Sequence, residues 1–262
     1  QMEMEFFVKP GDDEQWYDYW KDARLKWYGK YGIRAENLRL RPHDKDELAH
    51  YAKGCVDIEY QFPFGWSELE GIANRTDFDL KQHAQFSGKA LDYFDEESKQ
   101  KIVPYVIEPS AGADRATLAF LVDAYHEEEV RSEKRVVLRF HAELAPLKIA
   151  VLPLLKKNDR IVETAKKLTA DLRRRWHAVY DDTASIGRLY RRQDEVGTPF
   201  CVTVDVQTVG DEKAGADDKV TIRDRDTMEQ VRVPIGNLET VMAELMAGNW
   251  SAVAGQHGVI KN

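Results

Sequence analysis

The chain has 262 residues, a formal net charge of −8 and 43% hydrophobic residues, which together indicate a soluble globular protein of about two domains. No apolar run is long enough to cross a bilayer, and the first residues lack the basic cluster of a targeting segment. The two cysteines, Cys55 and Cys201, are too few and too far apart for a zinc site or a disulfide framework, so a reducing cytoplasm and no protein-held metal are expected.

The first eight residues, Gln-Met-Glu-Met-Glu-Phe-Phe-Val, alternate polar and apolar side chains, which predicts a strand with Glu3 and Glu5 on one face. Solvated glutamates and ligand-binding glutamates fit this pattern equally well. A sequence that begins in mid-strand, without an initiator methionine, also suggests that an upstream segment is missing. Residues Glu14–Tyr31 then have the pattern of a helix, whose tryptophans and tyrosines are expected in the core.

The next stretch predicts a strand over Leu38–His43, a short helix over Asp46–Ala52 and a strand over Cys55–Phe62. A turn and an extended run follow, with Glu68 and Glu70 expected on one face. Clustered carboxylates there could bind a divalent cation, typically Mg²⁺ brought with ATP phosphates, although solvated acids also fit the pattern.

The centre of the chain combines a strand, a turn and a helix. Residues Ile102–Ile107 form an apolar run that predicts a strand, Pro109 is expected to stop it, and Gly112 permits a turn. A helix is predicted from Asp114 onward. The apolar residues expected on one face of that helix are Leu118, Leu121, Val122 and Tyr125.

Three side chains at this junction could carry chemistry. Glu108, Ser110 and Arg115 offer a carboxylate, a hydroxyl and a guanidinium, which suit an amine, a carbonyl and a phosphate. Structural alternatives are that Glu108 and Arg115 pair with each other and that Ser110 caps the helix, since strand–turn–helix junctions are common in proteins.

After a charged connector over residues 126–135, strands and helices alternate from Leu147, which predicts a small parallel sheet covered by helices. The predicted elements are strand Lys148–Leu154, helix Asp159–Trp176, strand Ala178–Tyr180, helix Ile186–Asp194, strand Phe200–Val206, paired edge strands Lys219–Arg225 and Gln230–Val233, and helix Leu238–Met246. The last residues form a polar tail without a pattern.

The first 145 residues carry nine more acidic than basic residues, whereas residues 146–235 carry two more basic than acidic ones. Any nucleic acid is therefore expected mainly at the second part. The candidate phosphate contacts are Arg188, Arg191, Arg192 and Arg223. A charge run on a helix is also typical of a solvated face.

Several stretches resemble one protein family. Residues 107–120, containing Glu-Pro-Ser-Ala-Gly-Ala-Asp-Arg, resemble motif 3 of the class II aminoacyl-tRNA synthetases in its glycyl-tRNA synthetase form. The first eight residues resemble the return strand of motif 2, and Phe62–Leu69 resembles a Phe-Pro-Phe-Gly-Trp-x-Glu-Leu segment of the same family. Residues 181–203 and 221–230 resemble its anticodon-binding domain.

The resemblance implies the C-terminal portion of a dimeric, eukaryote-like glycyl-tRNA synthetase that lacks motif 1 and most of motif 2. The implied fold is an α+β part of the catalytic core, with an antiparallel sheet and helices, over residues 1–145. An α/β anticodon-binding domain over residues 146–248 and a tail over residues 249–262 would follow.

The resemblance also implies roles for individual residues. Glycine would be held by Glu3, Glu108 and Ser110. ATP would be contacted by Glu68, Leu69, Gly112 and Arg115, with Arg115 also acting in catalysis. The tRNA would be contacted by Arg188, Arg191, Arg192 and Arg223.

The implied activity is ATP-dependent activation of glycine to glycyl-adenylate and its transfer to tRNA(Gly), with ATP and Mg²⁺ required. The full-length enzyme is expected to be a cytoplasmic homodimer without a membrane or DNA partner. We expect weak or no activity from these 262 residues alone. The alternative is a non-catalytic tRNA-binding or accessory fragment.

Overall fold

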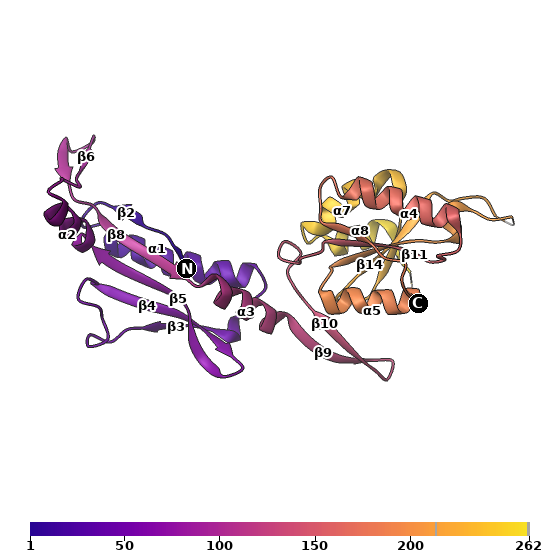
Figure 1. Cartoon of the computed structure of the whole chain (residues 1–262), viewed down its shortest axis with the longest axis horizontal. Coiled ribbons are helices and arrows are strands. Elements are labelled where there is room, and N and C mark those ends of the chain that lie inside the picture. Colours follow the sequence, from indigo (N-terminus) through magenta and orange to yellow (C-terminus); the bar gives the residue numbers. More distant parts are fainter. Residues whose placement is uncertain (213, 261–262) are drawn as a thin grey trace. The chain divides into compact units, whose positions relative to one another are not determined.

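The computed structural model describes residues 1–212 and 214–260 and divides the chain into two compact units, Gln1–Asp123 and Ala124–Asn262 (Figure 1). The predicted fold class is confirmed, because an antiparallel sheet with helices is followed by an α/β unit. Among the described residues, no helix is long and apolar enough to span a membrane.

The first unit is built on a six-stranded antiparallel sheet with the order β1-β8-β5-β4-β3, in which β2 also pairs with β8. Its strands are β1 (Met2–Glu3), β2 (Phe6–Val8), β3 (Leu38–Pro42), β4 (Gly54–Phe62), β5 (Gly65–Thr76) and β8 (Tyr105–Ala111). The other elements are helices α1 (Asp13–Lys30), α2 (Phe78–Ser87) and α3 (Ala113–Ala124), the short helix η1 (Ala35–Asn37), and a small hairpin of β6 (Tyr93–Asp95) and β7 (Gln100–Ile102).

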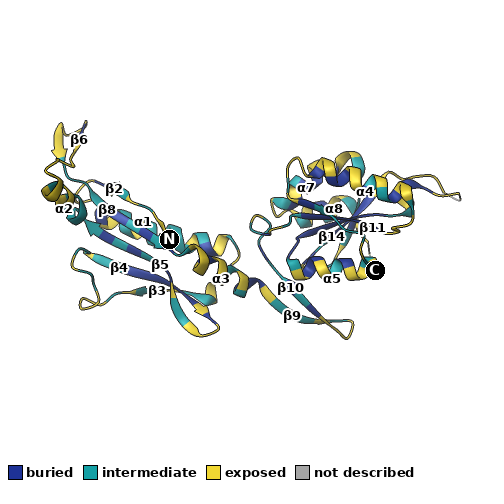
Figure 2. Ribbon diagram, viewed as in Figure 1, coloured by how far each residue is buried: buried dark blue, intermediate teal, exposed yellow. Residues whose placement is uncertain are grey.

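The two faces of this sheet differ in character. One face buries apolar strand residues against the aromatic side chains of α1 and the small residues of α3. Trp16, Trp20 and Tyr28 pack into this cluster, which confirms that the aromatic stripe belongs to the core (Figure 2). Because strand side chains alternate between faces, polar and small residues point to the other side, called the open face below. The open face carries Cys55, Asp57, Gly71, Ala73, Arg75, Glu108 and Ser110.

The strand predicted at the N-terminus is interrupted at residues 4–5, between β1 and β2. Pro109 does not end β8 as expected, but lies within it, opposite Ile72 of β5. A residue in an antiparallel pair directs its N–H and C=O to the same neighbour. The Pro109 carbonyl accepts a hydrogen bond from the Met4 N–H at 3.0 Å. The N–H that proline lacks would therefore point toward the same interruption between β1 and β2, and its absence disturbs the pairing of the sheet little.

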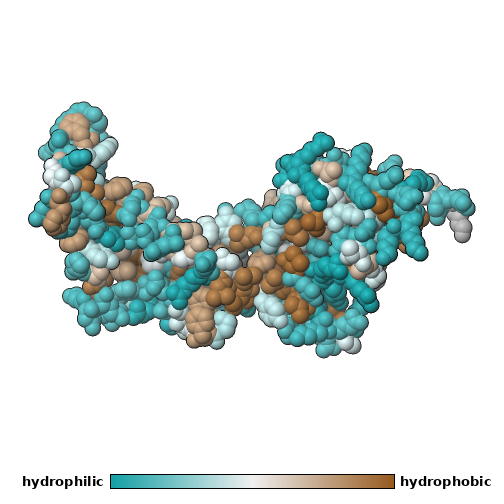
Figure 3. All heavy atoms as spheres, viewed as in Figure 1, coloured by the Kyte–Doolittle hydropathy of each residue, from teal (hydrophilic) through white to brown (hydrophobic). Residues whose placement is uncertain are grey.

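Two further predictions for this unit are wrong. Residues 46–52 form turns rather than a helix. In α3, Leu118 and Leu121 are 42% and 41% exposed, whereas the small residues Ala116 and Ala119 face the sheet. The small side chains allow the helix to approach the strands closely, which turns the larger leucines outward. Figure 3 shows hydrophobic side chains gathered along α3.

The second unit contains a six-stranded sheet with the order β12-β11-β13-β14-β15-β16. Its strands are β11 (Ile149–Pro153), β12 (Ala178–Tyr180), β13 (Phe200–Val204), β14 (Lys219–Asp224), β15 (Gln230–Pro234) and β16 (Val259–Ile260). Its helices are α4 (Asp159–Leu172), α5 (Ile186–Val196), α6 (Val206–Val209), η2 (Ile235–Asn237), α7 (Leu238–Met246) and α8 (Trp250–His257). A hairpin of β9 (Tyr125–Val130) and β10 (Glu133–Leu138) precedes the sheet.

Only β12, β11 and β13 are parallel, because β14, β15 and β16 run antiparallel to their neighbours. The predicted pairing of β14 with β15 is confirmed. However, β15 is not an edge strand, because β16 pairs with it. The predicted tail therefore contains a helix and a strand in its described part.

The predicted charged connector is the β9–β10 hairpin, which packs on α5. The compact unit therefore starts earlier than residue 146, where we placed the domain boundary.

A buried ionic cluster links four elements of the second unit. Asp194 of α5 is fully buried and accepts hydrogen bonds from Arg135 of β10 at 2.9 Å and from Arg223 of β14 at 2.8 and 3.1 Å. Arg135 also donates to Glu128 of β9 and to the carbonyl of Arg225. The carboxylate thus compensates two buried guanidinium groups, which fixes the hairpin to the helix and the sheet.

Candidate functional site

The open face of the first unit contains a cavity of about 180 Å³. Glu108 and Ser110 of β8 lie on this face opposite Ala73 and Gly71 of β5. The two small residues leave the space above the central strands free. The cavity is lined by His43, Glu47, Ala49, Tyr51, Ala52, Cys55, Gly71, Ala73, Arg75, Glu108 and Ser110. Its size suits a small polar ligand.

Glu108 is held by a neighbouring cation. Arg75 donates through Nη1 to Glu108 Oε1 at 3.0 Å and through Nε and Nη2 to Asp79 at 2.7 and 3.1 Å. The Arg75 guanidinium also lies 4.2 Å from the centre of the Tyr51 ring. These contacts fix the orientation of the Glu108 carboxylate at the edge of the cavity. Arg75 was not among the site residues predicted from the sequence, although its i,i+4 spacing with Asp79 was visible at the start of α2.

A second glutamate lies beside Glu108. Partial burial, a hydrogen bond with Glu108 and the charge of Glu108 raise the pKa of Glu5 to about 7, partly opposed by the charge of Arg75. Glu5 therefore carries a proton below about pH 7, next to Glu108. The alternation of Glu3 and Glu5 was the signal in the sequence, but it did not single out Glu5.

Glu3 and Ser110 are also brought together. Glu3 of β1 lies opposite Ser110 of β8 in the sheet register, and the Ser110 hydroxyl donates to Glu3 Oε1 at 3.5 Å. Gln1 Nε2 donates to Ser110 Oγ at 3.2 Å. The three residues predicted to hold glycine thus belong to adjacent strands of one face. A hydroxyl and several carboxylates there would favour a ligand with an ammonium group.

Arg115 lies apart from Glu108 in the hydrogen-bond network. It donates through Nη2 to Ser67 Oγ at 2.8 Å, and its guanidinium is 5.7 Å from the centre of the Phe62 ring. The structural alternatives, an ion pair between Glu108 and Arg115 and a helix cap by Ser110, are both absent from the contacts described for these residues. The exposed guanidinium is therefore available to an anionic ligand.

Gly112 has a role that differs from the one expected. A Cβ at this position would lie 3.3 Å from the Arg115 Cβ, closer than ordinary van der Waals contact. The glycine therefore permits the close approach of the first helical turn to the end of β8, rather than a left-handed backbone. A side chain there would displace Arg115.

Glu68 and Glu70 of β5, the neighbour of β8 in the sheet, were expected on one face but lie on opposite faces. The register of β4 and β5 shifts between Ile58 and Glu59, a β-bulge. Glu70 is consequently buried under α1, where it accepts hydrogen bonds from Arg24 at 2.6 and 3.0 Å and from Tyr28 at 2.7 Å. Glu68 remains exposed, and a Cβ on Gly71 would lie 3.6 Å from its carboxylate oxygen. The predicted pair of carboxylates for a cation is therefore not formed.

Leu69 lies between these glutamates and is only 1% exposed. Its side chain packs in the core of the first unit. A nucleotide could reach only the main chain of Leu69.

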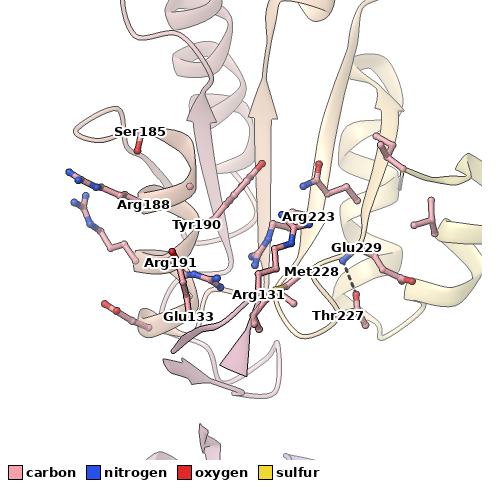
Figure 4. A pocket seen from close by; sticks show the side chains of 17 residues that line it. Arg131, Glu133, Ser185, Arg188, Tyr190, Arg191, Arg223, Thr227, Met228 and Glu229 are labelled. Carbon is pink, nitrogen blue, oxygen red and sulfur yellow. Dashed lines mark hydrogen bonds between the residues drawn. The ribbon is translucent and has the colours of Figure 1, made fainter. Parts of the chain in front are cut away.

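The second unit contains a surface groove of about 1290 Å³ (Figure 4). Arg188 and Arg191 of α5 line it on one side, β14 and β15 on the other, and Arg131 of the β9–β10 hairpin lies below them. Arg188 and Arg131 have no ion pair with any residue in the described ranges. Tyr190 also lines the groove, and its hydroxyl forms a 2.6 Å hydrogen bond with Thr203 of β13. Free guanidinium groups beside an aromatic ring suit a nucleic-acid backbone and its bases.

Arg191 lies 3.7 Å from the carboxylate of the buried Asp194, and the other two arginines predicted to bind tRNA have closer partners within the protein. Arg223 is 4% exposed and its guanidinium contacts Asp194 and the Tyr190 ring. Arg192 donates to Asp181 at 2.6 Å and to Thr183 at 2.7 Å. We therefore leave Arg223 out of the proposed contacts and expect a smaller contribution from Arg192.

Comparisons with known proteins agree with this arrangement. Residues 148–245 match the protein family described as "Anticodon binding domain". The chain is 54% identical over 256 residues to a glycine–tRNA ligase of Corynebacterium glutamicum, and the match covers 95% of this chain and 54% of that protein. The chain is a glycine–tRNA ligase homologue.

Other glycine–tRNA ligases show the same extent of similarity. The enzymes of Caldanaerobacter subterraneus and Geobacillus kaustophilus are 54% and 51% identical to this chain. These matches cover 93% and 94% of this chain, and 51% and 52% of the two proteins. The chain thus spans about half the length of the curated glycine–tRNA ligases it matches.

Proposed function

We propose that this chain supplies the glycine-binding face and the tRNA-binding unit of a glycine–tRNA ligase. The observation that carries the proposal is that Glu108 and Ser110 line one small cavity, with Glu3 paired to Ser110 on the adjacent strand, in a homologue of these ligases. The substrates would be glycine, ATP and tRNA(Gly), with Mg²⁺ carried by the ATP phosphates. Dimerisation, a cytoplasmic location and weak activity of the 262 residues alone stay predictions.

The proposed reaction begins with attack of the glycine carboxylate on the α-phosphorus of ATP, which expels pyrophosphate and forms glycyl-adenylate. Glu108 and Glu3 would hold the ammonium group, and Ser110 would orient the substrate by a hydrogen bond. Arg115 would stabilise the negative charge that develops on the phosphate oxygens. No protein side chain becomes a covalent nucleophile in this scheme.

The cavity would also select the amino acid by size. Its volume of about 180 Å³ includes the space between Arg75, Tyr51 and the small residues of β5. A longer amino acid would place apolar atoms against Glu108 and Arg75, which form a charged wall. Glycine has no side chain and avoids this cost.

Glycine binding should depend on pH through Glu5. Below about pH 7 Glu5 carries a proton, and above it the charged carboxylate adds to the charge of Glu108 beside the ammonium group. The KM for glycine should therefore fall as the pH rises from 6 to 8, by less than tenfold per unit for a single proton. The charged groups around Glu5 are Glu108, Arg75 and Asp79. Glu5→Gln should flatten the profile, and an unchanged profile in this variant would exclude Glu5.

The groove of the second unit gives a separate prediction for tRNA. Arg188→Ala and Arg191→Ala together should weaken tRNA binding and reduce the slope of log affinity against log salt by about 0.7 for each lost single-strand contact. Arg174→Ala is the control, because Arg174 is 80% exposed but lies outside the groove. Filter binding from low to moderate salt measures the slope. If the double variant and the control have equal slopes, the groove does not contact phosphate.

The activity itself is best tested in an assembled enzyme. The part of the Corynebacterium glutamicum ligase that the match leaves uncovered can be fused to this chain, and glycine-dependent exchange of pyrophosphate into ATP measured. Exchange that requires glycine supports the proposed function. If a folded chimera binds tRNA but does not exchange pyrophosphate, the chain is the accessory tRNA-binding fragment of the alternative hypothesis.

A further inference from the structure

A second group of side chains lies on the open face, and two of its members, His43 and Cys55, line the same cavity as Glu108 and Ser110. His43 directly follows β3, and Cys55 and Asp57 lie two residues apart on the same side of β4. One ring nitrogen of His43, the Cys55 sulfur and one carboxylate oxygen of Asp57 all lie within 4.8 Å of one another. None of the three residues has a role in the proposed ligase reaction.

The backbone holds these side chains in place. The His43 N–H donates to the Cys55 carbonyl at 3.0 Å, and Arg41 of β3 pairs with Asp57 of β4 in the antiparallel register. His43 Nε2 lies 2.8 Å from Asp57 Oδ2. His43 and Cys55 are half-buried and Asp57 is 8% exposed, so the group is partly shielded from water. Ligands fixed on adjacent strands need little reorganisation to bind a common ion.

We propose that His43, Cys55 and Asp57 bind a thiophilic divalent metal ion such as Zn²⁺. An imidazole nitrogen, a thiolate and a carboxylate are all ordinary zinc ligands, and the sulfur disfavours Mg²⁺ and Ca²⁺. In a tetrahedral site the ligand atoms are about 3.3–3.8 Å apart, so side-chain rotations of about an ångström complete the geometry. Water would fill the fourth position.

The neighbouring charges fit an outer shell for this site. Arg41 Nη1 lies 3.7 Å from Asp57 Oδ2, and Arg41 Nη2 donates a hydrogen bond to Glu47 at 2.5 Å. Arg41 thus orients the carboxylate without a short hydrogen bond to the oxygen that faces His43. Binding would replace the hydrogen bond between His43 and Asp57 by two bonds to the metal, with loss of the thiol proton to water.

The sequence did not reveal this group, because two cysteines 146 positions apart exclude a conventional zinc framework. The ligands come from two strands and include one cysteine only. The chain fold, and not a Cys-x-x-Cys spacing, brings them together.

The proposal is tested on the full chain without any activity assay. The purified protein is stripped with a chelator, dialysed against Zn²⁺ and then against metal-free buffer, and its metal content measured. Cobalt is used as a spectroscopic substitute, since a thiolate ligand gives a charge-transfer band that other ligands lack. His43→Ala, Cys55→Ser and Asp57→Asn are compared with His83→Ala, a control on α2 outside the group.

We expect about one equivalent of zinc and a thiolate–cobalt band in the wild type and in His83→Ala. Each ligand variant should lose more zinc affinity than the roughly 10–100-fold that is typical of an outer-shell substitution. Circular dichroism shows whether a variant is folded, and Asp57→Asn tests the site if Cys55→Ser does not fold. Substoichiometric zinc in the wild type, or a cobalt band that persists in Cys55→Ser, would overturn the proposal.

Discussion

Replacing Asp194 by alanine should destabilise the second unit by about 3–5 kcal/mol, the usual cost of removing one partner from a buried ion pair. Arg135 has a fully buried side chain and that of Arg223 is 5% exposed, so both guanidinium groups would lose their compensating charge. A domain of this size is typically stable by only about 5–15 kcal/mol. The variant is therefore expected to lose a large part of its folded population on mild heating.

The measurement is amide hydrogen exchange across β11, β13 and α5, combined with urea unfolding of the full chain. Asp171→Ala is a suitable control, because Asp171 pairs with Arg174 on the surface at 3.4 Å and such pairs contribute at most about 1 kcal/mol. Protection of the first unit should be unchanged. A loss in Asp194→Ala no larger than in the control would show that the buried cluster does not hold the hairpin to the sheet.

Replacing Arg115 by lysine should reduce pyrophosphate exchange in the assembled enzyme by about 10²–10³-fold, the usual effect of removing one donor from a transition-state oxyanion. The planar guanidinium presents two donors in a fixed fork, whereas lysine offers a point charge. Arg115 is exposed, and the one hydrogen bond described for its side chain is to Ser67. The melting temperature should therefore hardly change.

The structure makes this test sharper, because Arg115 does not pair with Glu108. A purely structural Arg115 would lose at most a surface hydrogen bond on substitution, with activity retained. Transfer RNA affinity should be unaffected in the lysine variant, since Arg115 lies in the first unit and the groove in the second. Full exchange by a stable lysine variant would remove Arg115 from the site.

The sequence predicted regular elements best where the hydrophobic pattern was strong and local. Helix α7 and strand β12 have the bounds that periodicity indicated, and α4 and α5 begin at the predicted residues. The pattern failed where tertiary contacts decide the outcome. Leu118 faces outward because Ala116 packs on the sheet.

The sequence indicated individual residues of the candidate site but not the contacts between them. The resemblance pointed to Glu108 and Ser110, and the sheet brings both to one cavity. Arg75 is 33 positions from Glu108, so no local pattern could pair them. The bulge at Leu69 of β5 places Glu70 in the core and Glu68 on the other face, because one shift in register exchanges the faces of a strand.

The measurement that bears most directly on the account is the KM for glycine in the assembled enzyme carrying Glu108→Gln. Loss of the charge that holds the ammonium group should raise this KM by about 10-fold or more, since hydrogen bonds to charged groups contribute about 1.5–3 kcal/mol. Glu97→Gln is the matched control, as Glu97 is exposed and pairs with Lys9. The account predicts a large increase for Glu108→Gln alone. Equal KM values for glycine in both variants would contradict the assignment of the open face as the glycine site.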